Sequence, residues 1–297
     1  IKPIFEEFTK DTGIKVVYVI DDANKMMNMI ARQGEDTQVD AFLAVDAGDL
    51  YFAQQMGIFQ PIRSRVLDRN IPSHLKDPSR QWFGLSLRVR SVAYHEKRVN
   101  PKGLSTYESL SSKQWKNRLA VRTSKRVYNK SMVAMMIAQL GYERTKQILK
   151  GWVNNFAGKP LQSDVEVLNK ILNNEADIGI VNSYYLAKMI KDNPELPLKM
   201  QWVGAADSAV HVNISGMGIT RYSKRKENAV LLLEWMSSKK GQKLFADMDM
   251  EYPTNRSVKP HKILQEWGRF KQVTLNVKKA GELRAKAISL MKEVGYE

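Results

Sequence analysis

The sequence predicts an α/β protein with two lobes, and three observations support this prediction. The chain has 297 residues, of which 43% are hydrophobic, so it is long enough for about two domains with cores of their own. Helical and strand patterns alternate along it, as in βαβ units on a parallel sheet. Two long extended runs, 82–94 and 209–215, separate the α/β blocks. We therefore expect two lobes joined by two crossing strands, with a hinge and a ligand cleft between the lobes.

The first 60 residues predict helices and strands in alternation. Ile1, Ile4 and Phe8 recur at helical spacing, and Gly13 stands where a helix commonly ends in the left-handed conformation. The β-branched run at 14–20 is typical of a buried strand. The next expected elements are a helix that ends near residue 34, a strand at 39–45 and a helix at 47–56.

The same alternation continues between and after the two extended runs. Strands are expected at 119–121 and 176–181 because both segments are short, apolar and flanked by helical patterns. The helices expected from periodicity lie near 107–110, at 131–140, 143–156, 164–172 and 183–191, and then at 227–237, 240–248 and about 280–294.

The composition excludes several classes of chemistry. Without cysteine, the chain has no thiol nucleophile, no disulfide and no cysteine-ligated zinc or iron–sulfur site. The phosphate-binding and nucleophile-elbow motifs of common enzymes are missing, and the four histidines are scattered. No apolar stretch is long enough to form a transmembrane helix. We therefore expect a binding protein that is not an enzyme and does not insert into a membrane.

The charge is large and unevenly distributed. The formal net charge is +16, yet residues 1–60 carry five basic and ten acidic side chains, and the rest carry 42 basic and 21 acidic ones. A positive field of this size attracts nucleic acid, anionic membranes or anionic ligands. The alternative is that the charge serves general solubility.

Tyrosines at two strand-to-helix junctions form the candidate site. Tyr184 and Tyr185 follow the strand expected at 176–181 and open the next helix. Tyr128 has the same context, because it lies between the strand expected at 119–121 and a helix. The carboxyl ends of parallel strands form the ligand edge of an open α/β sheet. The alternative is that the adjacent rings of residues 184 and 185 simply pack, one inward and one outward.

Polar groups next to these tyrosines fit an anionic site. Asn182 or Ser183 is a suitable N-cap for the helix that begins there. A phenol has a pKa of about 10 and becomes a good ligand when a strongly acidic cation such as Fe³⁺ displaces its proton. Arg88 and Arg90, on the first extended run, are candidates to hold an anion that completes the shell. Surface salt bridging is the alternative for each arginine.

Several stretches also match a known family in order along nearly the whole chain. The most specific is Asn-Ser-Tyr-Tyr-Leu-Ala at 182–187, together with the earlier Val-Tyr-Asn around Tyr128. With these motifs the chain resembles the periplasmic ferric-ion-binding proteins of bacterial ABC iron importers, which have the type II periplasmic binding protein fold. The matching stretches are 5–16, 39–50, 82–94, 122–131, 182–187 and 251–255.

The resemblance implies a role for each candidate residue. Tyr128, Tyr184 and Tyr185 would ligate Fe³⁺, and Arg88 would hold a synergistic anion such as carbonate or screen the phenolates. In this family a further ligand, His or Tyr, often follows the first strand of the mature protein. That strand would precede Ile1, so we can name no residue for this position.

The same resemblance implies the domain division, the partner and the location. The N-terminal lobe would comprise 1–90 and 213–255, without its first strand, and the C-terminal lobe would comprise 91–212 and 256–297. The protein would be periplasmic, or lipid-anchored outside the cytoplasm. As a monomer, it would capture Fe³⁺ in the cleft between the lobes and deliver it to an ABC permease in the inner membrane.

Two other functions stay open at this point. A carrier for another anion or an organic solute could use the tyrosines for stacking and Arg88 to grip a carboxylate. A nucleic-acid-binding protein would fit the charge of +16, but the sequence contains no recognised nucleic-acid module, so we expect no nucleic-acid partner.

Overall fold

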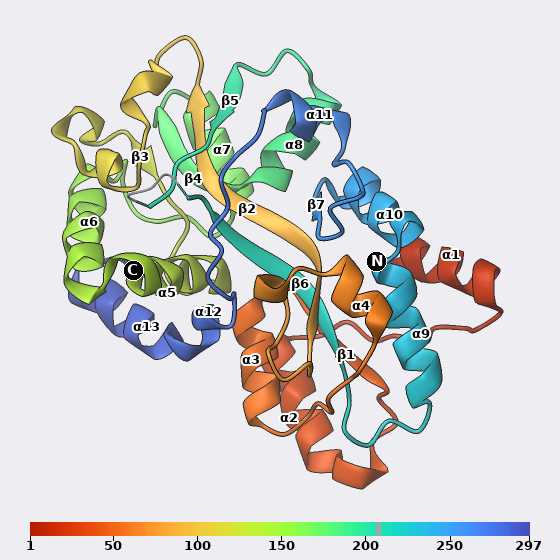
Figure 1. Ribbon diagram of the computed structural model, residues 1–297. Coiled ribbons are helices and arrows are strands. Elements are labelled where there is room, and N and C mark those ends of the chain that lie inside the picture. Colours follow the sequence, from red (N-terminus) through yellow and green to blue (C-terminus); the bar gives the residue numbers. More distant parts are fainter. Residues whose placement is uncertain (206–208) are drawn as a thin grey trace. The chain divides into compact units, whose positions relative to one another are not determined.

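The computed structural model describes residues 1–205 and 209–297, which form two packing units that are each discontinuous in sequence (Figure 1). Two long strands, β2 and β6, pass from one unit to the other. The lobes expected from the sequence remain a prediction, because packing units need not coincide with the bodies that move. Unit 1 comprises Ile1–Leu87, Ile214–His261 and Asn276–Gly281, and unit 2 comprises Arg88–Asn213, Lys262–Leu275 and Glu282–Glu297.

Unit 1 contains the N-terminal helices and three helical segments from later parts of the chain. Gly13 ends the first helix with φ of 73°, a conformation that glycine adopts without strain. The α-helices are α1 (Lys2–Thr12), α2 (Ala23–Gln33), α3 (Ala47–Gln55), α4 (Arg65–Asn70), α9 (Lys226–Ser237), α10 (Lys239–Asp249) and most of α12 (Lys279–Glu282), with 3₁₀ turns η1 (Gly34–Asp36) and η2 (Ser73–Leu75). The strands are β1 (Ala41–Ala44), β7 (Tyr252–Pro253), the first part of β2 (Phe83–His95) and the last part of β6 (His211–Ile219).

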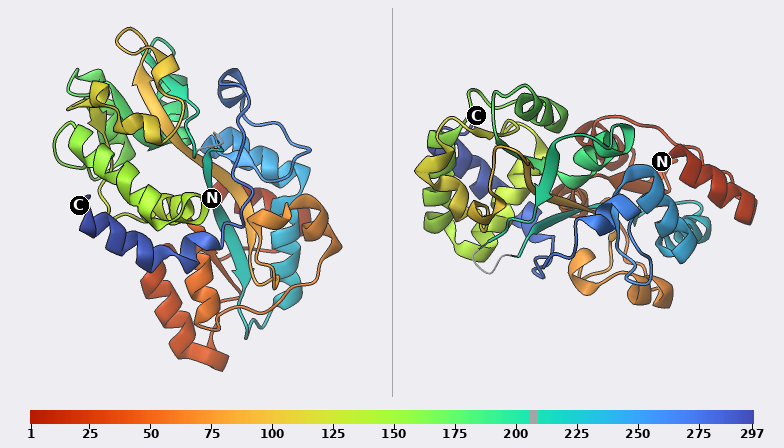
Figure 2. Two further views of the ribbon diagram at one scale, coloured as in Figure 1. Left: turned by 60° about the vertical axis from the view of Figure 1, so that its left-hand side comes forward. Right: turned by 90° about the horizontal axis from the view of Figure 1, so that it is seen from above.

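Unit 2 contains the candidate tyrosines. Its C-terminal helix α13 lies beside α5 in both views of Figure 2. The α-helices are α5 (Val127–Leu140), α6 (Tyr142–Asn155), α7 (Asp164–Leu172), α8 (Ser183–Asp192), α11 (Lys262–Glu266) and α13 (Arg284–Glu293), with 3₁₀ turns η3 (Pro101–Gly103), η4 (Glu108–Ser111) and η5 (Lys113–Trp115). The strands are β3 (Leu119–Ala120), β4 (Ile178–Asn182) and β5 (Leu198–Gln201).

The strands of unit 2 separate two apolar clusters. Val92 of β2 belongs to the cluster that includes side chains of α5, α6 and α13, whereas its neighbour Ala93 belongs to the cluster with α7 and α8. Ile180 and Val181 of β4 divide in the same way. Successive residues of a strand point to opposite faces, so helices cover both faces of this part of the sheet.

Two sequence predictions about strands are wrong. The run at 14–20 forms no strand, and Val17 and Ile20 are 83% and 79% exposed. None of the strand pairings described for the chain includes this run, and an extended segment without a paired neighbour does not count as a strand. The sheet is also not parallel throughout, because β1 with β6, and β2 with β4, β5 and β7, run antiparallel.

Other differences concern the ends of helices. The helix expected at 131–140 starts four residues earlier, so Tyr128 belongs to a helix rather than to a linking loop. The expected helix at 280–294 is divided into α12 and α13. The predicted helix at 164–172 is confirmed, and the side chain of Ser163 caps it.

Gly179 allows α7 to approach the strand that precedes the tyrosine pair. A Cβ atom at this position would lie 2.4 Å from Cγ1 of Val167. Replacing Gly179 with alanine is therefore expected to lower the free energy of unfolding by about 1–3 kcal/mol, the usual cost of overpacking. Urea unfolding of the variant measures this loss. Gly103→Ala is the control, because its nearest neighbours would lie 3.4 Å away, and an equal loss in both variants would contradict the prediction.

Candidate functional site

The candidate tyrosines follow two strands that are paired in parallel. Leu119 and Ala120 of β3 lie opposite Ile178 and Gly179 of β4. Because the strands run in the same direction, both end at the same edge of the sheet. The helix α8 begins directly after β4, and α5 begins a few residues after β3. The first turns of both helices therefore lie at one edge, as the sequence predicted for this pair of strands.

The tyrosines occupy the first turn of each helix. Tyr128 is the second residue of α5, and Tyr184 and Tyr185 are the second and third residues of α8. The two adjacent rings contact each other, with centroids 4.2 Å apart and planes inclined by 31°. The two residues have the same burial class, so they do not divide into one buried and one exposed ring, although the contact itself is the packing that the alternative expected. All three tyrosines are half-buried.

Electrostatic interactions show that the predicted residues are brought together. Burial raises the pKa of Tyr184, and the neighbouring Tyr128 and Tyr185 raise it further, whereas Arg88 opposes the rise. The structure therefore places Tyr128, the tyrosine pair and Arg88 within interacting distance in unit 2.

Cationic side chains cover the rings of the site. The guanidinium carbons of Arg88 and Arg122 lie 5.2 Å and 5.1 Å from the ring centroid of Tyr128. The ammonium group of Lys188 lies 5.4 Å from the ring centroid of Tyr184. Cations so close to an aromatic ring are attracted to its face, and they also favour an ionised phenolate. Arg88 is almost fully buried, so its charge acts in a region of low dielectric constant.

Arg90, the second arginine suggested by the sequence, is paired within the protein. Its guanidinium forms two hydrogen bonds to the carboxylate of Asp164, of 2.9 Å and 3.3 Å, and both residues are buried. Burial favours the neutral form of Arg90, but the charge and hydrogen bonds of Asp164 outweigh it and raise the pKa of the guanidinium. Arg90 is therefore committed to a buried carboxylate, which argues against its expected role in holding a ligand anion.

A buried histidine lies near the two arginines. Burial lowers the pKa of His211 to about 3, and the charges of Arg90 and Arg88 contribute to the fall. Its imidazole is therefore neutral at physiological pH. The Nδ1 atom is buried without a hydrogen-bond partner among the described residues.

The helix ends beside the tyrosines have no side-chain cap. The sequence predicted a cap by Asn182 or Ser183, but neither side chain accepts a hydrogen bond from the first turn of α8. The Nδ2 atom of Asn182 and the hydroxyl of Ser183 are buried and have no hydrogen-bond partner in the described part of the chain. The first turn of α5 also lacks a side-chain cap. Uncapped helix N-termini present N–H groups and a partial positive charge, both of which favour an anion.

Sequence reasoning missed three charged residues of this site. Arg122 lies in a stretch that matches the family, but nothing in its spacing marks it as a neighbour of the ring of Tyr128. Asp164 lies on α7, which the sequence gave no reason to connect with the tyrosines. Lys188 could have been predicted from the sequence, because it follows Tyr184 by four residues on one helix and therefore lies on the same helix face.

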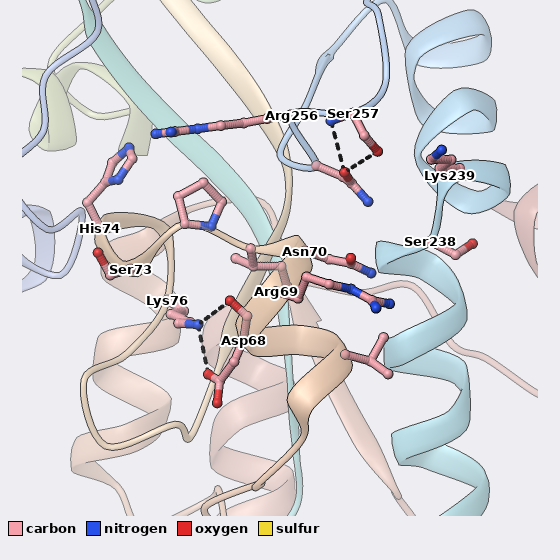
Figure 3. A pocket seen from close by; sticks show the side chains of 14 residues that line it. Asp68, Arg69, Asn70, Ser73, His74, Lys76, Ser238, Lys239, Arg256 and Ser257 are labelled. Carbon is pink, nitrogen blue, oxygen red and sulfur yellow. Dashed lines mark hydrogen bonds and ion pairs between the residues drawn. The ribbon is translucent and has the colours of Figure 1, made fainter.

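A hollow in unit 1 contains none of these residues (Figure 3). Its volume is about 940 Å³, and Arg69, Lys239 and Arg256 are among the side chains that line it. The carboxylate of Asp68 in its wall is bound by Lys76 at 2.8 Å. The hollow is therefore a basic surface feature that is separate from the tyrosine site.

Comparison of the sequence with known proteins identifies a family for this chain. The family model of the bacterial extracellular solute-binding proteins matches residues 37–276. Iron uptake protein A1 of Synechocystis is 33% identical over 99% of this chain and 83% of its own length. Iron uptake protein A2 of the same organism is 35% identical over 93% of this chain and 82% of its own length.

Solved structures agree with the sequence comparison. The structure of the Trichodesmium protein IdiA (FutA) in complex with iron and citrate has a TM-score of 0.94 and 36% identity, with 100% of this chain and 96% of that chain covered. Apo ferric ion-binding protein A of Pasteurella haemolytica has a TM-score of 0.91 and 33% identity, with 100% and 94% covered. The family resemblance and the α/β fold of a type II periplasmic binding protein are thereby confirmed. The chain belongs to the bacterial extracellular solute-binding proteins, within the group that includes the iron uptake and ferric ion-binding proteins.

Proposed function

We propose that this protein captures Fe³⁺ outside the cytoplasm through the phenolates of Tyr128, Tyr184 and Tyr185, and delivers it to an ABC permease. The observation that supports this proposal is the convergence of the three tyrosines at one sheet edge, beside the buried Arg88 and the partly buried Arg122. The iron uptake proteins of Synechocystis and the iron-bound structure from Trichodesmium are named for the same cargo.

The chemistry of the site suits a trivalent hard cation. Three phenolates supply three negative charges, which balance the charge of Fe³⁺ without histidine or cysteine. Burial raises the pKa of Tyr184, so its hydroxyl keeps the proton until a strongly acidic metal displaces it. The guanidinium groups of Arg88 and Arg122 then stabilise the anionic oxygens that result.

An anion would complete the coordination shell. Arg88 would hold it, and the uncapped first turns of α5 and α8 would add N–H donors. Asn182 and Ser183 have buried polar groups that such an anion could satisfy. Carbonate is our first candidate, and citrate, which accompanies iron in the Trichodesmium structure, is a second.

The family supports a cellular context for this proposal. The described residues include no helix that could span a bilayer, and we place the protein in the periplasm, free or held by a lipid anchor. It acts as a monomeric binding protein without enzymatic activity, and its partner is a permease of the inner membrane. A further ligand to the metal would come from outside the residues named above.

Loading with ferric citrate tests the proposal. We expect a visible absorption band from charge transfer between phenolate and iron, with about one iron per chain by metal analysis. Acidification should remove both the colour and the metal, because protons compete for the phenolates. Iron that binds without a visible band would contradict phenolate ligation. A colourless protein that instead retains an organic anion would support a carrier for such solutes.

A further inference from the structure

A buried ion pair connects the two segments that bear the tyrosines. Arg90 and Asp164 are 1% and 0% exposed, and they face each other through two hydrogen bonds. Arg90 belongs to β2 and Asp164 is the first residue of α7, so neither lies on a helix that bears a tyrosine. Each partner nevertheless has a further bond to one of the tyrosine-bearing segments.

The arginine is connected to the segment of Tyr128. Its Nε donates a hydrogen bond of 2.9 Å to Oδ1 of Asn129, the residue that follows Tyr128. Asn129 is fully buried, and its Nδ2 donates to the backbone oxygens of Arg122 and Thr123, in the turn that precedes α5. Asn129 therefore fixes the start of α5 relative to this turn and to β2.

The aspartate is connected to the segment of the tyrosine pair. Its Oδ2 accepts a hydrogen bond of 2.9 Å from the backbone N–H of Asn182, at the junction of β4 and α8. This junction lies two residues before Tyr184, so its position determines where the first turn of α8 begins. Arg90 supports the same strand by donating to the backbone oxygen of Ile180.

Stability alone does not explain a buried pair of charges at this place. Replacing such a pair with apolar residues of similar volume is often neutral or stabilising, because the charges lose their hydration on burial. A bidentate arginine–carboxylate pair does, however, fix distance and orientation better than apolar contacts do. The residues that orient metal ligands commonly change metal affinity about 10–100-fold when they are mutated.

We propose that Asp164, Arg90 and Asn129 are positioning residues, which hold the first turns of α5 and α8 at the separation that three phenolates need to reach one ferric ion. This inference rests on the function proposed above. It adds residues that contact neither the metal nor its anion. Without the pair, each tyrosine would remain in place on its own helix. The first turns of the two helices would, however, no longer be held at a fixed distance and orientation.

A double-mutant cycle between Asn129 and Tyr128 tests this role. Asn129→Ala should lower ferric affinity about 10–100-fold, measured by competition with citrate, and should shift the visible band. In a Tyr128→Phe background the same substitution should lower affinity by less than about threefold, because the phenolate that it positions is already gone. An equal loss in both backgrounds would mean that Asn129 acts through general destabilisation, and would overturn the inference.

Asn155 provides the matched control. It is also a buried asparagine of unit 2, and its Nδ2 donates to the backbone oxygens of Leu110 and Ser112, at 2.8 Å and 2.9 Å. Asn155→Ala should destabilise the fold much as Asn129→Ala does, yet leave ferric affinity and the visible band unchanged. A control variant that loses iron to the same extent would contradict the positioning role.

Asp164→Asn tests both connections at once. It should weaken ferric binding at least as much as Asn129→Ala, and the two substitutions together should be less than additive. If this variant fails to fold, the cycle at Asn129 decides the question.

Tyr128→Phe separates the two proposals. If it binds iron as tightly as the wild type, the ligand assignment and this inference both fail. If it loses iron while Asn129→Ala does not, only the positioning role fails.

Discussion

Phenylalanine in place of Tyr184 is expected to lower ferric affinity by more than about 100-fold, which exceeds the usual effect of residues outside the coordination shell. The substitution removes one anionic oxygen and keeps the ring that contacts Tyr185. The positive charges of Arg88, Arg122 and Lys188 would remain, so the site would hold a trivalent cation with too little negative charge around it. Competition with citrate, followed by metal analysis, measures the loss.

Two further variants and a control make this result specific. Tyr128→Phe and Tyr185→Phe should weaken binding in the same direction, and each should alter the visible band. Tyr142→Phe is the matched control, because Tyr142 lies on α6 of the same unit and its hydroxyl contacts Glu293 at the surface. We expect it to bind iron as the wild type does. Wild-type affinity in any of the three site variants would remove that tyrosine from the ligand set.

The helices could largely be predicted from the sequence because their signals are local. Gly13 ends α1 in the left-handed conformation, and the segment whose periodicity predicted a helix at 164–172 forms α7. The strand predicted at 14–20 was wrong because strand formation does not depend on local signals alone. Its β-branched residues favour extended backbone, but a strand also needs a paired neighbour, which a local pattern does not reveal.

The relative direction of the paired strands could not be predicted from the sequence either. Alternating helices and strands suggested a parallel sheet, yet β2 runs antiparallel to β4 and β5. The prediction of the site depended on one pairing only, that of β3 with β4, and this pair is parallel. The edge at which Tyr128 and Tyr184 were expected therefore exists even though most of the other pairings differ.

The residue types of the site were visible in the sequence, but their connections were not. Tyr128, Tyr184 and Tyr185 lie at strand-to-helix junctions that the sequence pattern predicts. Their role as ligands remains a prediction. Asp164 and Asn129 are joined through Arg90, and these three residues are separated by 35 to 74 positions in the chain. Buried polar networks of this kind form from distant segments, so neither periodicity nor composition indicates them.

Ferric affinity is expected to depend steeply on pH, by about 1000-fold per pH unit between about pH 5 and 7. Free phenols ordinarily hold their protons in this range, and each of three displaced protons contributes about a factor of ten per unit. Burial raises the pKa of Tyr184, which reinforces the protonated state of the iron-free protein. Acid therefore favours the iron-free form, and affinity falls as pH falls.

The protons that are released when iron binds can be counted at a single pH, which measures this dependence directly. Affinities then need not be compared between pH values at which ferric ion hydrolyses to different extents. A weakly buffered sample that is loaded with ferric citrate should release about three protons per chain, after correction for the protons that citrate takes up when it gives up its iron. Tyr128→Phe should release one fewer, and Tyr142→Phe should match the wild type. Release of no proton would mean that the metal is held by groups already ionised, such as carboxylates. A smaller but non-zero count would instead give the number of phenolates that take part, so the same titration tests the ligand set independently of affinity.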